Sequence, residues 1–249
     1  MPNVVKYQAI RRPLNYLSTG LFHAFLVFHL LMSPVLIIFA AARGILNGSF
    51  FMFLTIFLSS LFLGRAFCGW VCPATGLQEI IAQFIRKKTQ RNWMIYLKFG
   101  ISGVWLLAIV VLYLCHGVQR VDLTYGFSDI GLRQKIWMTL GATLILLPFG
   151  LLWGRWASCR YLCWIAPLMI LGRIIQRKVR TPALQVVFSQ DKCTDCKLCE
   201  RHCPMNLELD AASRQGSVGD MDCILCGNCI DACKSGALRY GLPSFGKHP

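Results

Sequence analysis

The residues of this chain that could do chemistry are above all its cysteines, because eight of the thirteen lie in two regular runs near the C-terminal end. The two runs read Cys193-x2-Cys196-x2-Cys199-x3-Cys203-Pro204 and Cys223-x2-Cys226-x2-Cys229-x3-Cys233. In such a run the first three thiolates bind one iron–sulfur cubane, and the fourth reaches the neighbouring cluster. The spacing therefore predicts a ferredoxin-like domain that holds two [4Fe–4S] clusters.

The same rule divides the eight cysteines into two ligand sets, because the two runs exchange their fourth cysteines. The predicted sets are Cys193, Cys196 and Cys199 with Cys233, and Cys223, Cys226 and Cys229 with Cys203. Paired zinc sites would more often show two C-x2-C pairs separated by a longer loop. A disulfide framework is disfavoured because a reducing cytoplasm keeps thiols free.

Four further cysteines form two shorter pairs, Cys68-x3-Cys72 and Cys159-x3-Cys163. Residues four apart share one face of a helix, so two facing pairs would offer four thiolates to a third iron–sulfur cluster. They could equally form redox-active dithiols, and buried cysteines also serve as ordinary packing residues. Arg65 and Arg155, which precede the pairs, would lower the thiolate pKa values and offset the cluster charge. Anchoring at the membrane surface is their alternative role.

The two short pairs belong to an internal repeat. Each copy contains a long apolar stretch, a Gly-Arg dipeptide, the cysteine pair, and a second apolar segment that ends in basic residues. The sequence separation from Cys72 to Arg86 equals that from Cys163 to Arg177. In the first copy the apolar residues of the second segment recur with a helical period opposite Gln78, which predicts a helix lying in the lipid headgroup region. A pseudo-twofold arrangement of the copies would bring the pairs together.

Composition indicates that the elements positioning these cysteines are membrane helices. The chain is 55% hydrophobic and 15% charged, against about 25% charged residues in soluble domains. Residues 1–180 contain 19 basic and three acidic residues, whereas residues 181–249 contain seven and eight. Basic residues that punctuate uncharged runs are typical of membrane proteins rather than of nucleic-acid-binding proteins. Four uncharged stretches reach the roughly 20 residues that cross a bilayer: Gly20–Ala42, Gly44–Leu63, Phe99–Gln119 and Ile136–Gly154.

The basic residues also predict the orientation. Lys6, Arg11 and Arg12 precede the first predicted span as inside anchors, and the connection after the second span and the segment after the fourth are strongly basic. By the positive-inside rule both termini face the cytoplasm. We therefore predict a multi-pass inner-membrane protein. Residues 1–180 would form an all-α four-helix bundle, and residues 181–249 a cytoplasmic α+β ferredoxin domain of the bacterial 2[4Fe–4S] type.

Two histidines, His23 and His29, lie in the first predicted span. They are six residues apart and do not share a helix face, so they form no evident pair of haem ligands. An ionisable residue inside a membrane is a functional candidate, and either histidine could hydrogen-bond a quinone carbonyl. A neutral, packed histidine is the alternative. The sequence has no Gly-x-Gly-x-x-Gly dinucleotide fingerprint, and we assign no catalytic residue.

The segment Phe67-Cys68-Gly69-Trp70-Val71-Cys72-Pro73, the second C-x3-C pair, the four apolar stretches and the double-cluster domain together resemble the NapH/MauN family of membrane polyferredoxins. The membrane core of NosR and of CcoG (RdxA) is related to this family. The resemblance implies quinol oxidation that feeds periplasmic reductases, or electron delivery for cofactor maintenance. The chain departs from the family pattern after Cys163, where Trp164 replaces the usual proline.

These observations predict an electron-transfer subunit of a quinone-linked redox complex. The predicted partners are membrane lipid, quinone and other redox subunits, and nucleic acid is not among them. The alternative function is an accessory membrane reductase that supports the maturation or maintenance of a metal centre in another enzyme.

Overall fold

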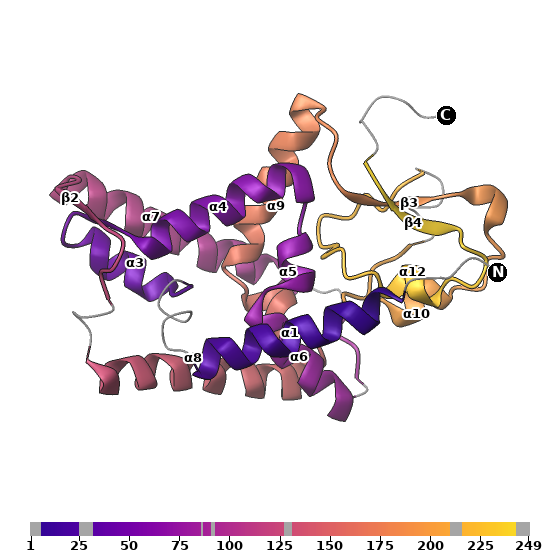
Figure 1. Ribbon diagram of the computed structural model, residues 1–249, viewed down its shortest axis with the longest axis horizontal. Coiled ribbons are helices and arrows are strands. Elements are labelled where there is room, and N and C mark those ends of the chain that lie inside the picture. The colour runs from indigo at the N-terminus through magenta and orange to yellow at the C-terminus, as the bar shows by residue number, and fades with distance from the viewer. Residues whose placement is uncertain are drawn as a thin grey trace.

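The computed structural model of the chain describes residues 6–24, 32–85, 87–90, 93–126, 131–209 and 216–242. A helical body and a smaller C-terminal part with short strands lie side by side (Figure 1). The helices of the body are α1 (Tyr7–Ala24), α3 (Pro34–Ala41), α4 (Gly48–Leu63), α5 (Ala66–Trp70), α6 (Pro73–Phe84), α7 (Leu97–His116), α8 (Leu132–Trp153) and α9 (Ile165–Val179). A 3-10 turn, η1 (Trp93–Tyr96), precedes α7, and a π-helix, η2 (Ser158–Leu162), precedes α9.

Helix α1 turns its polar residues inwards and its apolar residues outwards. Its exposed residues include Ile10, Leu14, Leu17 and Leu21, and its buried ones include Arg11, Asn15, Ser18 and Thr19. The buried side packs on α6, where Gly76 permits a close approach because a Cβ there would lie 2.0 Å from Thr19 Oγ1. A polar inner face with an apolar outer face is the arrangement expected of a helix in contact with lipid.

The prediction of one helix over Gly20–Ala42 is wrong. Helix α1 is described as far as Ala24, the backbone is extended at Ser33, and a new eight-residue helix, α3, begins at Pro34. The Ser33 hydroxyl caps α3 by accepting a hydrogen bond from the Leu36 amide at 3.3 Å. Pro34 has no N–H to continue a preceding helix, and proline is favoured at this first helical position.

The second predicted span, Gly44–Leu63, contains a strand and a helix. Strand β1 (Ile45–Asn47) pairs in parallel with β2 (Arg120–Asp122), and α4 begins directly after it. The Asn47 side chain caps α4 by accepting a hydrogen bond from the Phe50 amide at 3.1 Å. Helix α4 is apolar but has 16 residues, fewer than the roughly 20 that cross a bilayer perpendicularly.

In the part of the chain that the structure describes, two helices are long and apolar enough to cross a membrane. They are Trp93–His116, which combines η1 and α7, and Ile136–Trp153 within α8. The first overlaps the third predicted span, and the second overlaps the fourth. Large apolar side chains are exposed on both helices, among them Val104, Leu107, Leu114, Leu144 and Leu152. Contiguous exposed apolar surface of this kind suits contact with lipid or with another subunit.

In the structure, each copy of the repeat packs its helices on helices of the other copy. Helix α4 of the first copy packs on α9 of the second, and α6 of the first packs on α8 of the second (Figure 1). Gly172 brings α9 close to α4, because a Cβ there would lie 1.9 Å from Ser60 Oγ. Gly64 and Gly154 end the first helices of the two copies with φ values of 57° and 102°, a conformation that favours glycine. The chain thus turns at equivalent points before each cysteine pair.

Gln78, on the polar side of helix α6, packs inside the protein. Gln78 is fully buried: its amide oxygen accepts a hydrogen bond from the Trp156 amide at 2.9 Å, and its nitrogen donates to Ser158 Oγ at 3.3 Å. Ile80 and Phe84 are exposed instead. Gln78 therefore joins the two copies of the repeat, whereas Ile81 is buried and Ile80 and Phe84 face outwards.

The C-terminal part contains β3 (Gln185–Phe188) and β4 (Leu238–Gly241), an antiparallel pair in which Phe188 lies opposite Leu238. Between the strands lie the short turn η3 (Gln190–Lys192) and the helices α10 (Leu198–His202) and α12 (Asn228–Ala232). Helix α9 ends at Val179, so the predicted domain boundary falls between this helix and β3.

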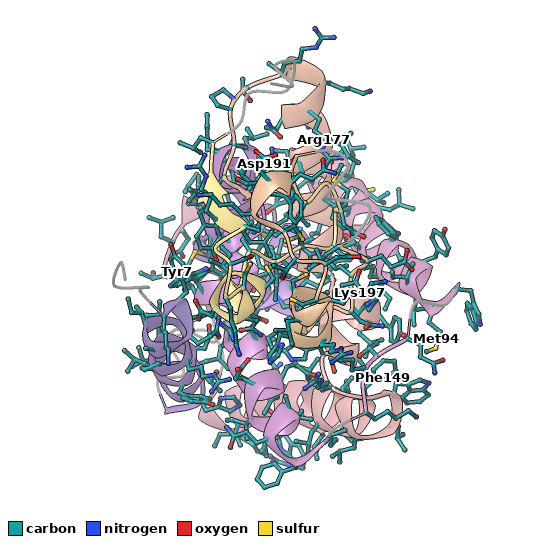
Figure 2. The ribbon with its side chains drawn as sticks, turned by 90° about the vertical axis from the view of Figure 1, so that its right-hand side faces the viewer. Tyr7, Met94, Phe149, Arg177, Asp191 and Lys197 are labelled. Carbon is teal, nitrogen blue, oxygen red and sulfur yellow. The ribbon has the colours of Figure 1, made fainter. Side chains whose placement is uncertain are left out.

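The start of α1 is attached to the C-terminal part. The amides of Tyr7 and Gln8 donate hydrogen bonds of 3.0 and 2.8 Å to the two carboxylate oxygens of Asp231 in α12. A carboxylate at this position satisfies unpaired N–H groups and complements the helix dipole. Figure 2 looks onto this end of the molecule, with Tyr7 at one edge of the C-terminal part.

Candidate metal centre

The first three cysteines of the second run line a hollow together with the last cysteine of the first run. The cysteines that line it are Cys203, Cys223, Cys226 and Cys229, which form one of the two predicted ligand sets. Burial raises the pKa of Cys203 to about 11 and that of Cys226 to about 12. Thiols in this hollow therefore keep their protons near neutral pH until a metal displaces them.

The other predicted ligand set lies nearer the surface. Cys193 and Cys196 are exposed, and Cys199 and Cys233 are half-buried. Cys233 lies within electrostatic range of Cys196 and Cys199. The Cys193 sulfur accepts a hydrogen bond from the Asp195 amide at 3.4 Å, the kind of contact that tunes a cluster potential. Asp191 and Lys197, which flank the first cysteines of this run, lie on the side that faces the viewer in Figure 2.

The structure brings the two short cysteine pairs together. Cys68, Cys72, Cys159 and Cys163, called the cysteine quartet below, all line one hollow. The prediction that each pair shares one helix face is wrong, because α5 ends at Trp70 and the second pair spans the π-helix η2. The quartet forms because the two copies of the repeat pack on each other, and Trp164 does not separate the pairs.

The quartet touches the second cysteine run directly. Gly69 lies between Cys68 and Cys72, and a Cβ at this glycine would lie 2.2 Å from the Ile224 carbonyl oxygen. The neighbouring Trp70 Nε1 donates a hydrogen bond of 2.9 Å to the Leu225 carbonyl. The backbone between the first cysteine pair is therefore in contact with the backbone that joins Cys223 to Cys226.

A buried ionic network lies beside both sites. Arg65 lines the quartet hollow, and its Nη1 lies 3.1 Å from Oδ1 of Asp222. Lys98 binds the same carboxylate oxygen. Burial alone would raise the pKa of Asp222, but Arg65 and Lys98 hold it below its ordinary value. Because Cys223 follows Asp222, the network connects the quartet to the second ligand set.

The remaining predicted residues have different surroundings. Arg155 does not line the quartet hollow and lines a polar cleft instead. His23 lines an apolar cavity of about 460 Å³, and Cys72 lines both this cavity and the quartet hollow. The His23 Nδ1 donates to the Thr19 carbonyl at 2.8 Å, and its Nε2 lies 3.2 Å from Thr143 Oγ1. His29 lies outside the described residues.

Comparison with known proteins assigns iron–sulfur domains to three segments. A family model described as a 4Fe-4S binding domain matches twice, at residues 48–92 and 136–182. These two matches coincide with the two copies of the repeat. A model described as a 4Fe-4S dicluster domain matches residues 185–234. No solved structure matches the chain.

Three relatives place the chain in a family. Ferredoxin-type protein NapH of Escherichia coli is 28% identical over 175 residues, 68% of this chain and 59% of the relative. Methylamine utilization ferredoxin-type protein MauN of Methylobacillus flagellatus is 29% identical over 153 residues, 58% and 50% of the two chains. Uncharacterized protein MJ0750 of Methanocaldococcus jannaschii is 31% identical over 201 residues, 74% and 75% of the two chains. The chain belongs to the NapH/MauN-type polyferredoxin family. This polyferredoxin spans between half and three quarters of the length of these relatives.

The polyferredoxin has buried guanidinium groups whose N–H donors find no partner among the described residues. The donors are Arg65 Nε, Arg160 Nε and Nη2, and Arg173 Nη1. Arg65 lines the quartet hollow, Arg160 donates to the carbonyl of Met205, and Arg173 lies within electrostatic range of Cys223. A buried donor without an acceptor is costly, and the sulfur atoms of an anionic cluster would accept these bonds. Thiols combined with these donors therefore fit iron–sulfur clusters.

The sequence pattern singled out Arg65 but did not identify Arg160 and Arg173 as functional. Arg160 lies between the cysteines of the second pair, and Arg173 interrupts the apolar residues of α9. Isolated charges inside apolar segments are the signal that could have found them. Arg11, interpreted as an inside anchor, is fully buried and donates to Glu79 Oε2 at 3.0 Å and to the Gly69 carbonyl at 3.2 Å.

Replacing Asp222 with asparagine is expected to lower the free energy of unfolding by about 3–5 kcal/mol, because Arg65 and Lys98 would lose their shared buried counter-ion. Chemical denaturation of the detergent-solubilised polyferredoxin, followed by circular dichroism, measures the effect. The matched control Glu208→Gln removes an exposed carboxylate of the same domain and should change stability by about 0.5 kcal/mol at most. Equal denaturation midpoints for the two variants would contradict the prediction.

Proposed function

We propose that this polyferredoxin is the membrane electron-transfer subunit of a quinone-linked redox complex. The observation that carries the proposal is the apolar cavity of about 460 Å³, because Cys72 lines both this cavity and the quartet hollow. The ferredoxin-type names of the relatives support the electron-transfer part. [4Fe–4S] clusters, when bound, supply reversible one-electron transfer. The two predicted ligand sets and the quartet would hold three of them.

The cavity has the size and lining that suit a quinone ring. Pockets for small ligands are mostly apolar, with few polar groups that fix orientation. Aromatic residues in its wall include Phe22, Trp105 and Trp137. Its polar groups include His23 and Thr143. These residues would hold the ring beside Cys72 and exclude water from it.

His23 has the arrangement of a proton acceptor for a quinol. The Thr19 carbonyl can only accept, so the ring nitrogen Nδ1 carries the hydrogen of the 2.8 Å bond. In the neutral ring Nε2 is then an acceptor, and it accepts from the Thr143 hydroxyl at 3.2 Å. A quinol hydroxyl that replaces the Thr143 hydroxyl would find the same acceptor. This geometry supports quinol oxidation as the direction of the reaction.

Membrane location belongs to the same proposal. The two long apolar helices and the outward apolar face of α1 support insertion into a bilayer. The excess of basic residues before the first predicted span and after α8 supports a cytoplasmic location for the C-terminal part. A redox partner would dock there, beside the exposed Cys193 and Cys196.

Filling the cavity tests the proposal. Gly141 lines the cavity, and a Cβ there would meet no atom within 4 Å, so Gly141→Leu should occupy the ring site without a backbone clash. In proteoliposomes, reduction of the clusters by a quinol analogue should slow by about tenfold or more, because the occupied pocket no longer admits the ring. Reduction by dithionite should be unchanged.

The matched control is Gly103→Leu, which adds the same side chain at an exposed position of α7 where a Cβ also meets nothing. This control should keep the wild-type rate. Equal rates in Gly141→Leu and wild type would contradict the quinol site. If quinol reduces neither protein but the clusters donate to a metal ion or a thiol partner, the accessory reductase is the function instead.

A further inference from the structure

A second cleft, polar and about 380 Å³ in volume, lies between the helical body and the C-terminal part. Arg12 of α1 and residues of α6 contribute to the body side, together with Arg155, which follows α8. The opposite side comes from α10 and α12 and includes Arg201 and His202. The residues on the two sides are far apart in the sequence, so this cleft exists only in the folded molecule.

Positive charge in this cleft exceeds negative charge. Glu79 is the only acidic residue among those that line the described cleft, and both of its oxygens are already paired. Oε2 lies 3.0 Å from Arg11, and Oε1 lies 3.2 Å from Arg12. Within the described ranges, no ion pair involves Arg155 or Arg201. The cleft therefore retains unbalanced guanidinium charge.

The cleft also contains hydrogen-bond donors for an anion. Arg155 Nε is buried and has no partner among the described residues. The Tyr16 hydroxyl accepts a hydrogen bond from Gln83 Nε2 at 2.8 Å, which leaves the hydroxyl hydrogen for a further acceptor. A compact anion with several oxygen atoms would satisfy these donors at once.

Exposed apolar residues lie close in the sequence to residues that line the cleft. Leu17 next to Tyr16, Phe84 next to Gln83, and Leu152 near the end of α8 are 59%, 80% and 62% exposed. Arg155 lies two residues beyond Trp153, where the candidate membrane span ends. Cationic pockets at the ends of membrane helices bind lipid headgroups whose acyl chains lie along the adjacent apolar surface.

We propose that this cleft binds the phosphoryl group of an anionic phospholipid, with Arg155 and Arg201 as its principal ligands. Guanidinium groups match phosphoryl oxygens through paired, charge-assisted hydrogen bonds. Arg155 belongs to the body and Arg201 to α10. One headgroup would therefore connect the membrane part to the C-terminal part, independently of any quinone.

Native mass spectrometry of the full, cluster-loaded chain in detergent tests the site. The probes are phosphatidylglycerol, phosphatidylcholine with the same acyl chains, and inorganic phosphate. The double variant Arg155→Gln/Arg201→Gln should bind phosphatidylglycerol about tenfold more weakly than wild type, because both charge-assisted contacts are lost. The control Arg239→Gln removes an exposed charge from β4 and should keep the wild-type affinity.

The arms of the experiment separate the two sources of a phosphoryl group. Preference for phosphatidylglycerol over phosphatidylcholine, lost in the double variant, supports the lipid. Binding of inorganic phosphate alone, also lost in the double variant, supports the phosphoryl site and assigns its ligand to solution. Equal phosphatidylglycerol affinity in the double variant and wild type overturns the proposal. Iron content shows whether the double variant folds. If it does not, the phosphatidylglycerol affinity of Arg201→Gln alone, a change at an exposed side chain, is compared with that of wild type instead.

Discussion

The loaded protein is expected to contain about twelve irons per chain, and the double variant Cys68→Ser/Cys159→Ser about eight. The reason is geometric, because the two substitutions together remove one thiol from each of the two pairs that line the quartet hollow. The eight cysteines of the C-terminal runs are untouched. Iron and acid-labile sulfide, measured per chain after anaerobic purification, give the numbers directly.

The chain offers a matched control for this experiment. Cys115 is an exposed cysteine of α7 outside both runs and the quartet. Cys115→Ser should therefore keep about twelve irons. A content of about eight irons in wild type, control and double variant alike would show that the quartet holds no cluster, as expected of a dithiol pair.

Gly69→Ala is expected to destabilise the folded protein by about 1–3 kcal/mol, because the added methyl group has no room. Its Cβ would lie 2.2 Å from the Ile224 carbonyl oxygen, and this contact is with backbone that cannot rotate away. The same displacement would move the chain between Cys223 and Cys226, so we also expect a broadened or lost electron paramagnetic resonance signal from that ligand set.

Gly103→Ala is the control for this glycine. It makes the same change in α7, where a Cβ meets nothing within 4 Å, and alanine is the better helix former. Its unfolding midpoint should equal or exceed that of wild type. A Gly69→Ala protein with wild-type midpoint and spectrum would show that the quartet segment and the second cysteine run separate without cost.

The sequence predicted how the cysteines group and which segments form the two long apolar helices, but it did not predict the breaks inside the first and second apolar stretches. Thiolate spacing is a local property, so the runs and the repeat can be read along the chain. The first span failed because Gly20–Ala42 is uncharged throughout, yet Ser33 and Pro34 begin a new helix inside it. Hydropathy alone does not detect such a break.

The polar residues Arg11 of α1 and Gln78 of α6 show what charge and polarity along the sequence do not predict. In water a polar face points outwards, but beside lipid the polar groups bond to one another inside the bundle. Gln78 and Arg11 are accordingly buried. The partners of Arg11 include Glu79, which lies far away in the sequence. Such long-range pairs cannot be predicted from one amino-acid sequence.

The attachment of Tyr7 and Gln8 to Asp231 has a consequence for biogenesis. Helix α1 receives its N-terminal cap from a residue that follows Tyr7 by 224 positions, so α1 is synthesised well before its cap. Asp231 lies between Cys229 and Cys233, so its position depends on the iron loading of both ligand sets. We expect the capping of α1 to follow cofactor insertion. In an iron-starved chain the start of α1 would then stay uncapped, and cellular proteases could recognise it as a mark of incomplete assembly.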